Sequence, residues 1–207
     1  MTRPYLVGLT GSIGMGKTET ARMFARLGIP VYDADAAVHR LYEPGGAAVA
    51  EIAKGFPDCV VDGRVDRDRL AAGVRNRPDG LQRLEAIVHP LVAAEQQDFL
   101  AKAEAAGTEM VVLDIPLLFE TGSHVRMDAV VVVSAPHDVQ RARVLARPGM
   151  TADKLDHILA RQMPDAEKRA KAHFVIETDK GLGHAFQQVE QVIAALHARR
   201  LKDQNRA

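Results

Sequence analysis

The sequence predicts an α/β fold: a five-stranded parallel sheet flanked by helices in three layers, with a helical insertion and a helical lid. Two observations carry this prediction. Short apolar runs alternate with amphipathic helical segments along the chain, a pattern typical of strand–helix–strand units with right-handed crossovers. In addition, the first apolar run leads directly into a glycine-rich loop and then into a helix.

The five apolar runs are the expected strands. The third run is apolar on both faces up to Leu113, and the fourth is apolar throughout, as buried parallel strands are. A helix follows the first strand and ends at Gly28. A last helix, with Phe186, Val189, Ile193 and Leu196 at helical spacing, precedes a polar end (199–207) that we expect to be frayed. The predicted strands are 5–9, 29–32, 110–115, 129–133 and 174–176, and the first helix is 17–27.

The composition is that of an ordinary soluble globular protein with enough residues for a sizeable core: 207 residues, 47% hydrophobic and 26% charged. The formal net charge is zero, so no overall field attracts nucleic acid or an anionic membrane, and any phosphate-binding charge must be local. Neither a signal peptide nor a run of about 20 apolar residues is recognisable. Cys59, the only cysteine, excludes an internal disulfide and is expected to be a small buried hydrophobe. We therefore expect a cytoplasmic protein.

The loop after the first strand, residues 11–18, fits the phosphate-binding pattern G-x-x-x-x-G-K-[ST]. Glycines let the backbone turn its N–H groups inward to form a nest for phosphate oxygens, and the start of the following helix adds the positive end of its dipole. We expect Lys17 to reach the β- and γ-phosphates and the Thr18 hydroxyl to bind Mg²⁺, as in P-loop NTPases that use ATP. The expected nucleotide-binding residues are Gly11, Ser12, Ile13, Gly14, Met15, Gly16, Lys17, Thr18, Glu19 and Arg147.

Carboxylates follow the second and third strands, at the edge where open parallel sheets bind ligands. Asp35 suits the N-cap of a helix that starts at the next residue, so we favour Asp33 as the functional acid. Asp33 would then accept or orient the proton of an acceptor hydroxyl. Asp114, near the end of the third strand, is expected to hold Mg²⁺ with Thr18. The alternative for Asp114 is a cap for the loop that follows.

Residues 36–106 are predicted to form an all-helical insertion that holds the acceptor substrate. Turns are expected at Pro44-Gly45-Gly46, around Pro57-Asp58 and at Asp62-Gly63. His89-Pro90 interrupts two helical stripes, and proline suits the first turn of a new helix. His89 is a cap, a buried hydrogen-bonding group or a cleft residue, and the residues alone favour a structural role.

Residues 137–171 contain eight Lys or Arg against five Asp or Glu. Arg143 and Arg147 are four residues apart and therefore share a helix face. Pro148-Gly149 ends that helix before a second one, and two hinged helices with arginines indicate a lid that closes over a triphosphate. Arg143 would then act catalytically by covering the transferring oxygens. The alternative is a solvated, charged helical hairpin.

These features together indicate an enzyme that phosphorylates a small molecule, because phosphoryl transfer mainly needs positioning and charge neutralisation. A kinase of a nucleoside monophosphate or of another small metabolite is the nearest alternative. A GTP-dependent switch would carry the guanine-reading N-K-x-D motif, which is missing, and a helicase or partition ATPase would need a larger chain or a basic face. A non-catalytic binding module leaves the combination of Lys17, Thr18 and Asp33 unexplained.

Five segments together resemble the dephospho-coenzyme A kinase family, and the similarity covers nearly the whole chain. The run P-L-L-F-E with D-A-D and H-P is the discriminating part, since the P-loop alone is generic. The segments are Gly8 to Thr18, Asp33-Ala34-Asp35, His89-Pro90, Pro116 to Glu120, and a lid of Gln140, Arg143, Arg147, Arg161-Gln162-Met163-Pro164 and Lys168.

The resemblance implies ATP- and Mg²⁺-dependent phosphorylation of the ribose 3′-hydroxyl of dephospho-coenzyme A, the last step of coenzyme A synthesis, with Asp33 as base. A small-molecule substrate and a monomer or weak homo-oligomer are expected, without nucleic-acid or membrane partners. The implied domains are a core (1–35, 107–136 and 172–200), a substrate-binding insertion (36–106) and a lid (137–171). The resemblance moves five residues into the expected substrate cleft, namely His89, Leu117, Leu118, Phe119 and Glu120.

The sequence departs from the family pattern in the P-loop and after the fifth strand. Ser12, Met15 and Glu19 replace the usual Gly, Ser and Thr. Residues 177–181 lack the usual Asn before the glycine, which leaves open how the adenine edge is contacted; backbone groups are able to supply such contacts.

Overall fold

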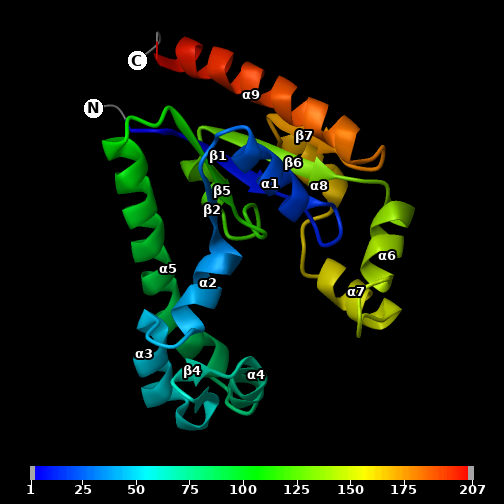
Figure 1. The fold of residues 1–207 in the computed structure, drawn as a ribbon. Coiled ribbons are helices and arrows are strands. Elements are labelled where there is room, and N and C mark those ends of the chain that lie inside the picture. Colours follow the sequence, from blue (N-terminus) through cyan, green and yellow to red (C-terminus); the bar gives the residue numbers. More distant parts are fainter. Residues whose placement is uncertain (1–2, 205–207) are drawn as a thin grey trace. The chain divides into compact units, whose positions relative to one another are not determined.

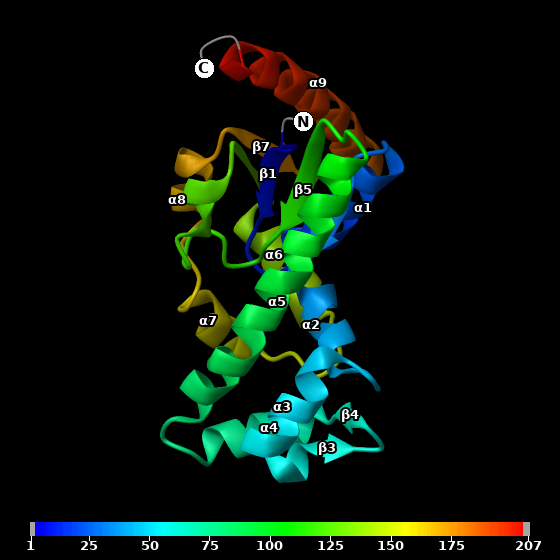
Figure 2. The same ribbon diagram turned by 90° about the vertical axis from the view of Figure 1, so that its left-hand side faces the viewer.

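The computed structural model describes residues 3–204 and divides into two compact units (Figures 1 and 2). The first unit contains the chain up to Val31 and from Gly107 onward, and the second is Tyr32–Ala106. The expected lid, residues 137–171, belongs to the first unit. Over the described residues, no helix is both long and apolar enough to cross a membrane.

The chain forms a five-stranded sheet with the strand order β2-β5-β1-β6-β7, and all of its strands lie in the first unit except β2, which begins at the last residue of that unit before the chain enters the second. The central strand β1 runs parallel to β5 and to β6, and β6 runs parallel to β7. Each observed strand lies within two residues of its predicted bounds. The strands are β1 (Tyr5–Thr10), β2 (Val31–Asp33), β5 (Met110–Asp114), β6 (Ala129–Ser134) and β7 (Phe174–Glu177).

Helices complete the first unit, and they differ from the prediction in two places. The segment 137–171 contains three helices instead of two. The last helix continues to Gln204, so residues 199–204 are not frayed; residues 205–207 lie outside the described part. The helices are α1 (Lys17–Arg26), the short 3-10 helix η2 (Ser123–Arg126), α6 (His137–Leu145), α7 (Ala152–Leu159), α8 (Asp165–Lys171) and α9 (Leu182–Gln204).

The end of α9 is tied to the first strand, which is why it remains helical. The Tyr5 hydroxyl donates to Asp203 (2.9 Å) and accepts from Nε of Arg199 (3.1 Å). These contacts to β1 hold residues 199–204 in the helix, whereas the polar composition predicted a frayed end.

The sheet is buried on both faces, and consecutive residues of β6 show this. Val131 packs in the core that contains Phe24 of α1, whereas Val132 packs with Leu118 in a second core. Successive strand side chains point to opposite faces, so a strand covered on both sides is a continuous apolar run. The predicted three-layer α/β/α arrangement is confirmed.

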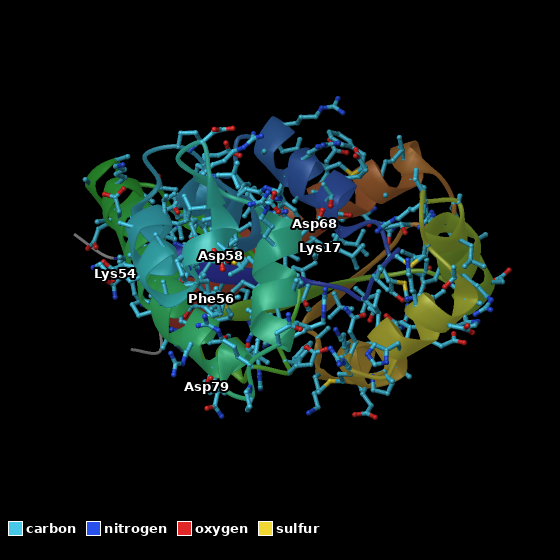
Figure 3. The ribbon with its side chains drawn as sticks, turned by 90° about the horizontal axis from the view of Figure 1, so that it is seen from below. Lys17, Lys54, Phe56, Asp58, Asp68 and Asp79 are labelled. Atoms are coloured by element: carbon cyan, nitrogen blue, oxygen red, sulfur yellow. The ribbon has the colours of Figure 1, made fainter. Side chains whose placement is uncertain are left out.

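The second unit, Tyr32–Ala106, has a core of its own, in which Phe56 is buried with Ile52 and Leu70. In Figure 3, Phe56 lies inside this unit and Lys54 points away from it. Cys59 is buried in the same core, and burial raises the pKa of its thiol. The elements are α2 (Ala34–Tyr42), α3 (Ala47–Gly55), η1 (Pro57–Cys59), β3 (Val60–Val61), β4 (Arg64–Val65), α4 (Arg67–Arg75) and α5 (Gly80–Ala105).

Two predictions for this unit were wrong. The unit is not all-helical, because β3 and β4 form an antiparallel hairpin. Asp62 (φ 50°) and Gly63 (φ 75°) form its two-residue turn, for which Asp-Gly is a favoured pair. His89-Pro90 does not interrupt the helix either: α5 is continuous with Pro90 inside it. The contacts of α5 with α2, α3 and α4 outweigh the hydrogen bond that proline removes.

Burial of α9 is tested by a pair of leucines on the same helix. Leu196 is fully buried and Leu201 is 57% exposed. We expect Leu196→Ala to lower the free energy of unfolding by about 2–5 kcal/mol, because it leaves a cavity in the core. Leu201→Ala should change it by less than about 0.5 kcal/mol. Urea denaturation of both variants measures the difference, and equal losses would contradict the assigned packing.

His173 predicts a pH dependence of stability. Its Nδ1 accepts from the Val130 N–H (3.0 Å), which requires that nitrogen to be unprotonated, and burial, with help from Arg199, lowers the His173 pKa below its usual 6.5. Just below that value the unfolded chain binds more protons than the folded one. This contribution to stability is therefore complete above about pH 6.5 and is lost as the pH falls toward the folded-state pKa.

The matched variant is His173→Asn, whose amide oxygen can replace Nδ1 as acceptor but does not titrate. We expect the wild type to lose more unfolding free energy than this variant between about pH 7.5 and about pH 5.5 in urea titrations. Parallel pH profiles would contradict the assignment.

Candidate functional site

The glycine-rich loop joins β1 to α1 at the carboxyl edge of the sheet. Gly14 (φ 79°) and Gly16 (φ 95°) adopt the left-handed conformation that glycine takes without strain. A Cβ at Gly11 would lie 2.7 Å from the Val133 carbonyl oxygen of the neighbouring strand. The glycines of the motif therefore meet needs of the fold as well as leaving backbone N–H groups accessible to phosphate.

Lys17 and Asp114, both predicted site residues, form an ion pair. The strand register explains this, because Leu9 of β1 lies opposite Asp114 of β5 and both strands end at the same edge. The Asp114 side chain is only 2% exposed and that of Lys17 is 15% exposed. The pair therefore places a cation and a buried carboxylate at the phosphate-binding loop.

The oxygen donors at this edge fit a magnesium ion. Asp114 supplies a carboxylate and Thr18, which is exposed in the first turn of α1, supplies a hydroxyl. Among residues 3–204 no group of three or more His, Cys, Asp or Glu could hold a metal alone. Such a sparse donor set suits Mg²⁺, which keeps several waters and takes further oxygens from phosphates.

Arg143 and Arg147, two arginines of the expected lid, lie next to the loop. Arg143 donates to the hydroxyl (2.9 Å) and to the carbonyl (2.6 Å) of Thr178, just after β7. Arg147 and Arg143 line a cavity of about 240 Å³ together with Gly16 and Glu19. Only Arg143 lies on α6, which ends at Leu145, so the expectation that both arginines share one helix face was wrong; Arg147 follows the helix and borders the same cavity.

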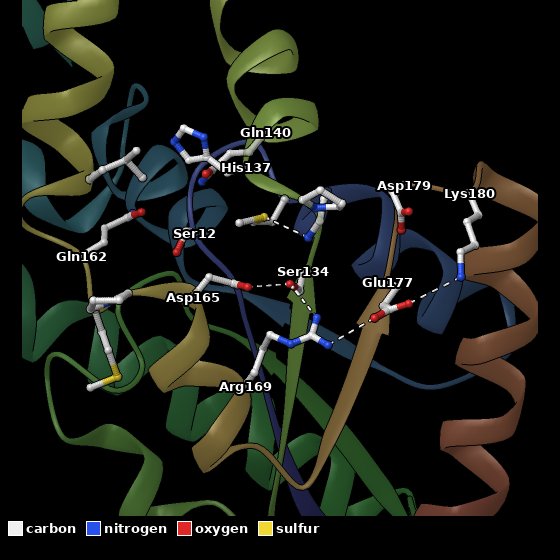
Figure 4. Close-up of a pocket in the computed structure, with 16 residues that line it drawn as sticks. Ser12, Ser134, His137, Gln140, Gln162, Asp165, Arg169, Glu177, Asp179 and Lys180 are labelled. Atoms are coloured by element: carbon white, nitrogen blue, oxygen red, sulfur yellow. Dashed lines mark hydrogen bonds and ion pairs between the residues drawn. The ribbon is translucent and has the colours of Figure 1, made fainter.

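A larger cavity of about 590 Å³ lies beside the loop and is lined by Ser12, the end of β6 and residues of α8 (Figure 4). Its wall carries a chain of polar contacts: Ser134 donates to Asp165 (2.7 Å), and Arg169 donates to Ser134 (3.0 Å) and to Glu177 (3.2 Å). Sequence reasoning missed these residues. Ser134 directly follows the fourth apolar run, so the rule that ligands bind at carboxyl ends of strands would have identified it.

Asp33 and His89 both belong to the second unit. Asp33 is the N-cap of α2, accepting from the Ala36 N–H (2.9 Å). The assignment of the capping role to Asp35 was therefore wrong, because the helix begins two residues earlier than expected. His89 is an exposed residue in the middle of α5.

The segment 116–120 divides between core and surface. Leu118 and Phe119 are core residues, which corrects the expectation that their side chains line a cleft, whereas Leu117 is 41% exposed. Apolar side chains beside a buried strand gain most by packing against it.

Glu120 connects this segment to the stretch between α7 and α8. Its Oε1 accepts from the Met163 N–H (2.8 Å) and pairs with the Lys168 ammonium (2.9 Å), which is fully buried. Burial acts to raise the Glu120 pKa, but Lys168 and the Met163 N–H outweigh it, so that the pKa lies below its usual 4.5. Glu120 therefore links segment 116–120 to Met163 and Lys168 within the first unit.

The sequence matches the model of one family, dephospho-CoA kinase, over residues 5–184. A dephospho-CoA kinase from Rhodopseudomonas palustris (strain BisB18) is 55% identical over 92% of this chain and 94% of its own length. One from Mesorhizobium japonicum is 56% identical over 94% of this chain and 98% of its own length.

Two solved structures are similar in fold. The protein TT1252 from Thermus thermophilus has a TM-score of 0.81 and 36% identity, with 94% of this chain and 98% of that chain covered. A dephospho-CoA kinase from Campylobacter jejuni has a TM-score of 0.65 at 21% identity, covering 93% and 97% of the two chains.

The Glu120–Lys168 pair predicts non-additive stability changes. Lys168→Met should lower the free energy of unfolding by about 3 kcal/mol, because it leaves a partly buried carboxylate without its cation. Glu120→Gln in the Lys168→Met background should recover more than half of that loss, since glutamine keeps the acceptor for Met163 and carries no charge. Denaturation of both single variants and the double variant measures the coupling. Additive losses would show that the pair contributes nothing.

Proposed function

The chain belongs to the dephospho-CoA kinase family, and on that premise we propose which of its residues carry out the transfer of phosphate from ATP to dephospho-CoA. The acceptor atom in this proposal is the ribose 3′-hydroxyl, and the product is coenzyme A. The observation that supports the proposal most is the Lys17–Asp114 pair at a glycine-rich loop.

Lys17 and the loop amides act on the phosphates of ATP. The Lys17 ammonium compensates the charge of the β- and γ-phosphates, and Gly11 to Thr18 supply backbone donors. Asp114 and Thr18 would hold Mg²⁺, which neutralises charge on the phosphate oxygens. Arg143 and Arg147 lie beside the loop, where their positive charges compensate the negative charge on the oxygens of the transferring phosphoryl group.

Asp33 is proposed as the base that takes the proton of the acceptor hydroxyl. Its Oδ1 accepts from the Ala36 N–H, which fixes the orientation of the carboxylate at the start of α2. Oδ2 makes no hydrogen bond within residues 3–204 and is available to a hydroxyl. A carboxylate fixed at one oxygen and open at the other suits the alignment of an acceptor.

The acceptor would be held by the second unit and by exposed residues of segment 116–120. His89 and Leu117 have exposed side chains and remain proposed substrate contacts. Glu120, Leu118 and Phe119 would act by holding Leu117 in place. We also propose a cytoplasmic location, which the free, buried Cys59 supports, and a monomer or weak homo-oligomer.

The test compares Asp33→Asn with Asp35→Asn as matched control. Asparagine is as good an N-cap as aspartate, so the Asp33 variant should keep α2. With ATP, Mg²⁺ and dephospho-CoA, we expect Asp33→Asn to lower kcat by a factor of about 10²–10⁴ and Asp35→Asn to leave it within about twofold. Coenzyme A is measured by mass spectrometry, and ATP binding by calorimetry.

Each outcome has one meaning. Equal rates in the two variants would contradict the assignment of Asp33 as base while leaving the reaction intact. No product from a folded wild type that binds ATP would contradict the proposed acceptor.

A further inference from the structure

Side chains from outside the phosphate-binding loop hydrogen-bond to two of its carbonyl groups. Nε2 of Gln140 on α6 donates to the Ile13 carbonyl (2.8 Å). The Thr178 hydroxyl donates to the Met15 carbonyl (2.7 Å). Each bond fixes the rotation of one peptide group of the loop.

The orientation of a carbonyl sets the direction of the next N–H, because a trans peptide is planar and its C=O and N–H point in opposite directions. The N–H groups of Gly14 and Gly16 therefore point away from Gln140 and Thr178. Neither N–H donates a hydrogen bond within residues 3–204. We propose that Thr178 and Gln140 are positioning residues that aim these two N–H groups at the phosphates of bound ATP.

Thr178 is itself held firmly. It is 8% exposed, and its own N–H donates to the Ser134 carbonyl (3.0 Å), which fixes it at the ends of β6 and β7. A Cβ added to Gly16 would come within 3.2 Å of its side chain, so the threonine fills the space next to the loop.

Arg143 decides where the hydroxyl proton of Thr178 points. The guanidinium donates to the hydroxyl oxygen at 2.9 Å, so the hydroxyl must give its own proton to a carbonyl. Two carbonyls are near, Met15 at 2.7 Å and Ser134 at 3.4 Å, and the shorter contact is the stronger. Arg143 thus reinforces the bond to Met15 as well as lying beside the loop.

Gln140 is equally buried, at 3% exposure, and the peptide it holds is bound on its other side too. The Ile13 N–H donates to Oε1 of Gln162 (3.1 Å). Two amide side chains therefore fix residue Ile13, and Gln140 sets the plane that carries the Gly14 N–H.

The experiment removes one donor at a time and varies the number of phosphates on the ligand. Thr178→Val keeps the shape but has no hydroxyl, and Thr178→Ser restores the hydroxyl. We expect Thr178→Val to weaken binding of ATP and ADP about tenfold and that of AMP less than about twofold, because the loop amides contact the phosphates beyond the first. Thr178→Ser should bind all three within about twofold of the wild type.

Gln140→Met provides a second, independent test, with Gln188→Met as matched control. Gln188 also clamps a backbone, donating to the Glu177 carbonyl (2.8 Å) and accepting from its N–H (2.9 Å), but it does not touch the loop. We expect Gln140→Met to show the same loss for ATP and ADP, and Gln188→Met to show none. Calorimetry gives the affinities, and thermal unfolding shows that each variant is folded.

Three results would overturn the inference. ATP affinity in Thr178→Val equal to that in Thr178→Ser would show that the hydroxyl is not needed. An equal loss for AMP would assign Thr178 to the adenosine part of the ligand. If Thr178→Val does not fold, an ATP affinity of Gln140→Met equal to that of the wild type would overturn the inference. Failure of the wild type to bind ATP would instead contradict the proposed function.

Discussion

The site depends on one constraint: the central strand β1 is buried on both faces, and it must still end in a loop whose peptide groups face a ligand. Its neighbours β5 and β6 end at the same edge, so each delivers a residue to that loop. From β5 comes Asp114, which pairs with Lys17, and from β6 comes Ser134, whose carbonyl anchors Thr178. Parallel strands bring their carboxyl ends together, so residues far apart in sequence, such as Lys17 and Asp114, meet at one edge of the sheet.

Most of the first unit could be predicted because its signals are local. The runs that became β1, β5 and β6 are apolar on both faces up to their last residue, as strands covered on both faces are. Lys17 and Asp114 were each predicted as site residues from the loop motif and from the strand end, but their ion pair was not predicted. Arg143 and Arg147 were identified by their spacing, although the helix ends at Leu145 and only Arg143 lies on it.

The features that could not be predicted from the sequence depend on tertiary packing, or on a choice between two residues with nearly equal local preferences. Asp62-Gly63 was seen as a turn, but the two-residue strands around it are too short to show alternation, so the hairpin was missed. Pro90 indicated a break that the contacts of α5 override. Asp33 and Asp35 are both good caps, and the choice between them depends on a shift of two residues in the start of α2. Thr178 stands in no recognisable motif, and the lid resemblance that included Gln140 did not show that its side chain reaches the Ile13 carbonyl.

The match to the family model and the folded unit end at different residues of this chain. The model match ends at residue 184, soon after α9 begins, whereas that helix continues for another twenty residues and places Val189, Val192 and Leu196 against the sheet. Its last turn then reaches back to Tyr5 on the first strand. The residues that match the family model therefore do not include all of the core around the sheet. A chain that ended at residue 184 would keep the phosphate-binding loop but leave the apolar surface under Val189, Val192 and Leu196 open to water.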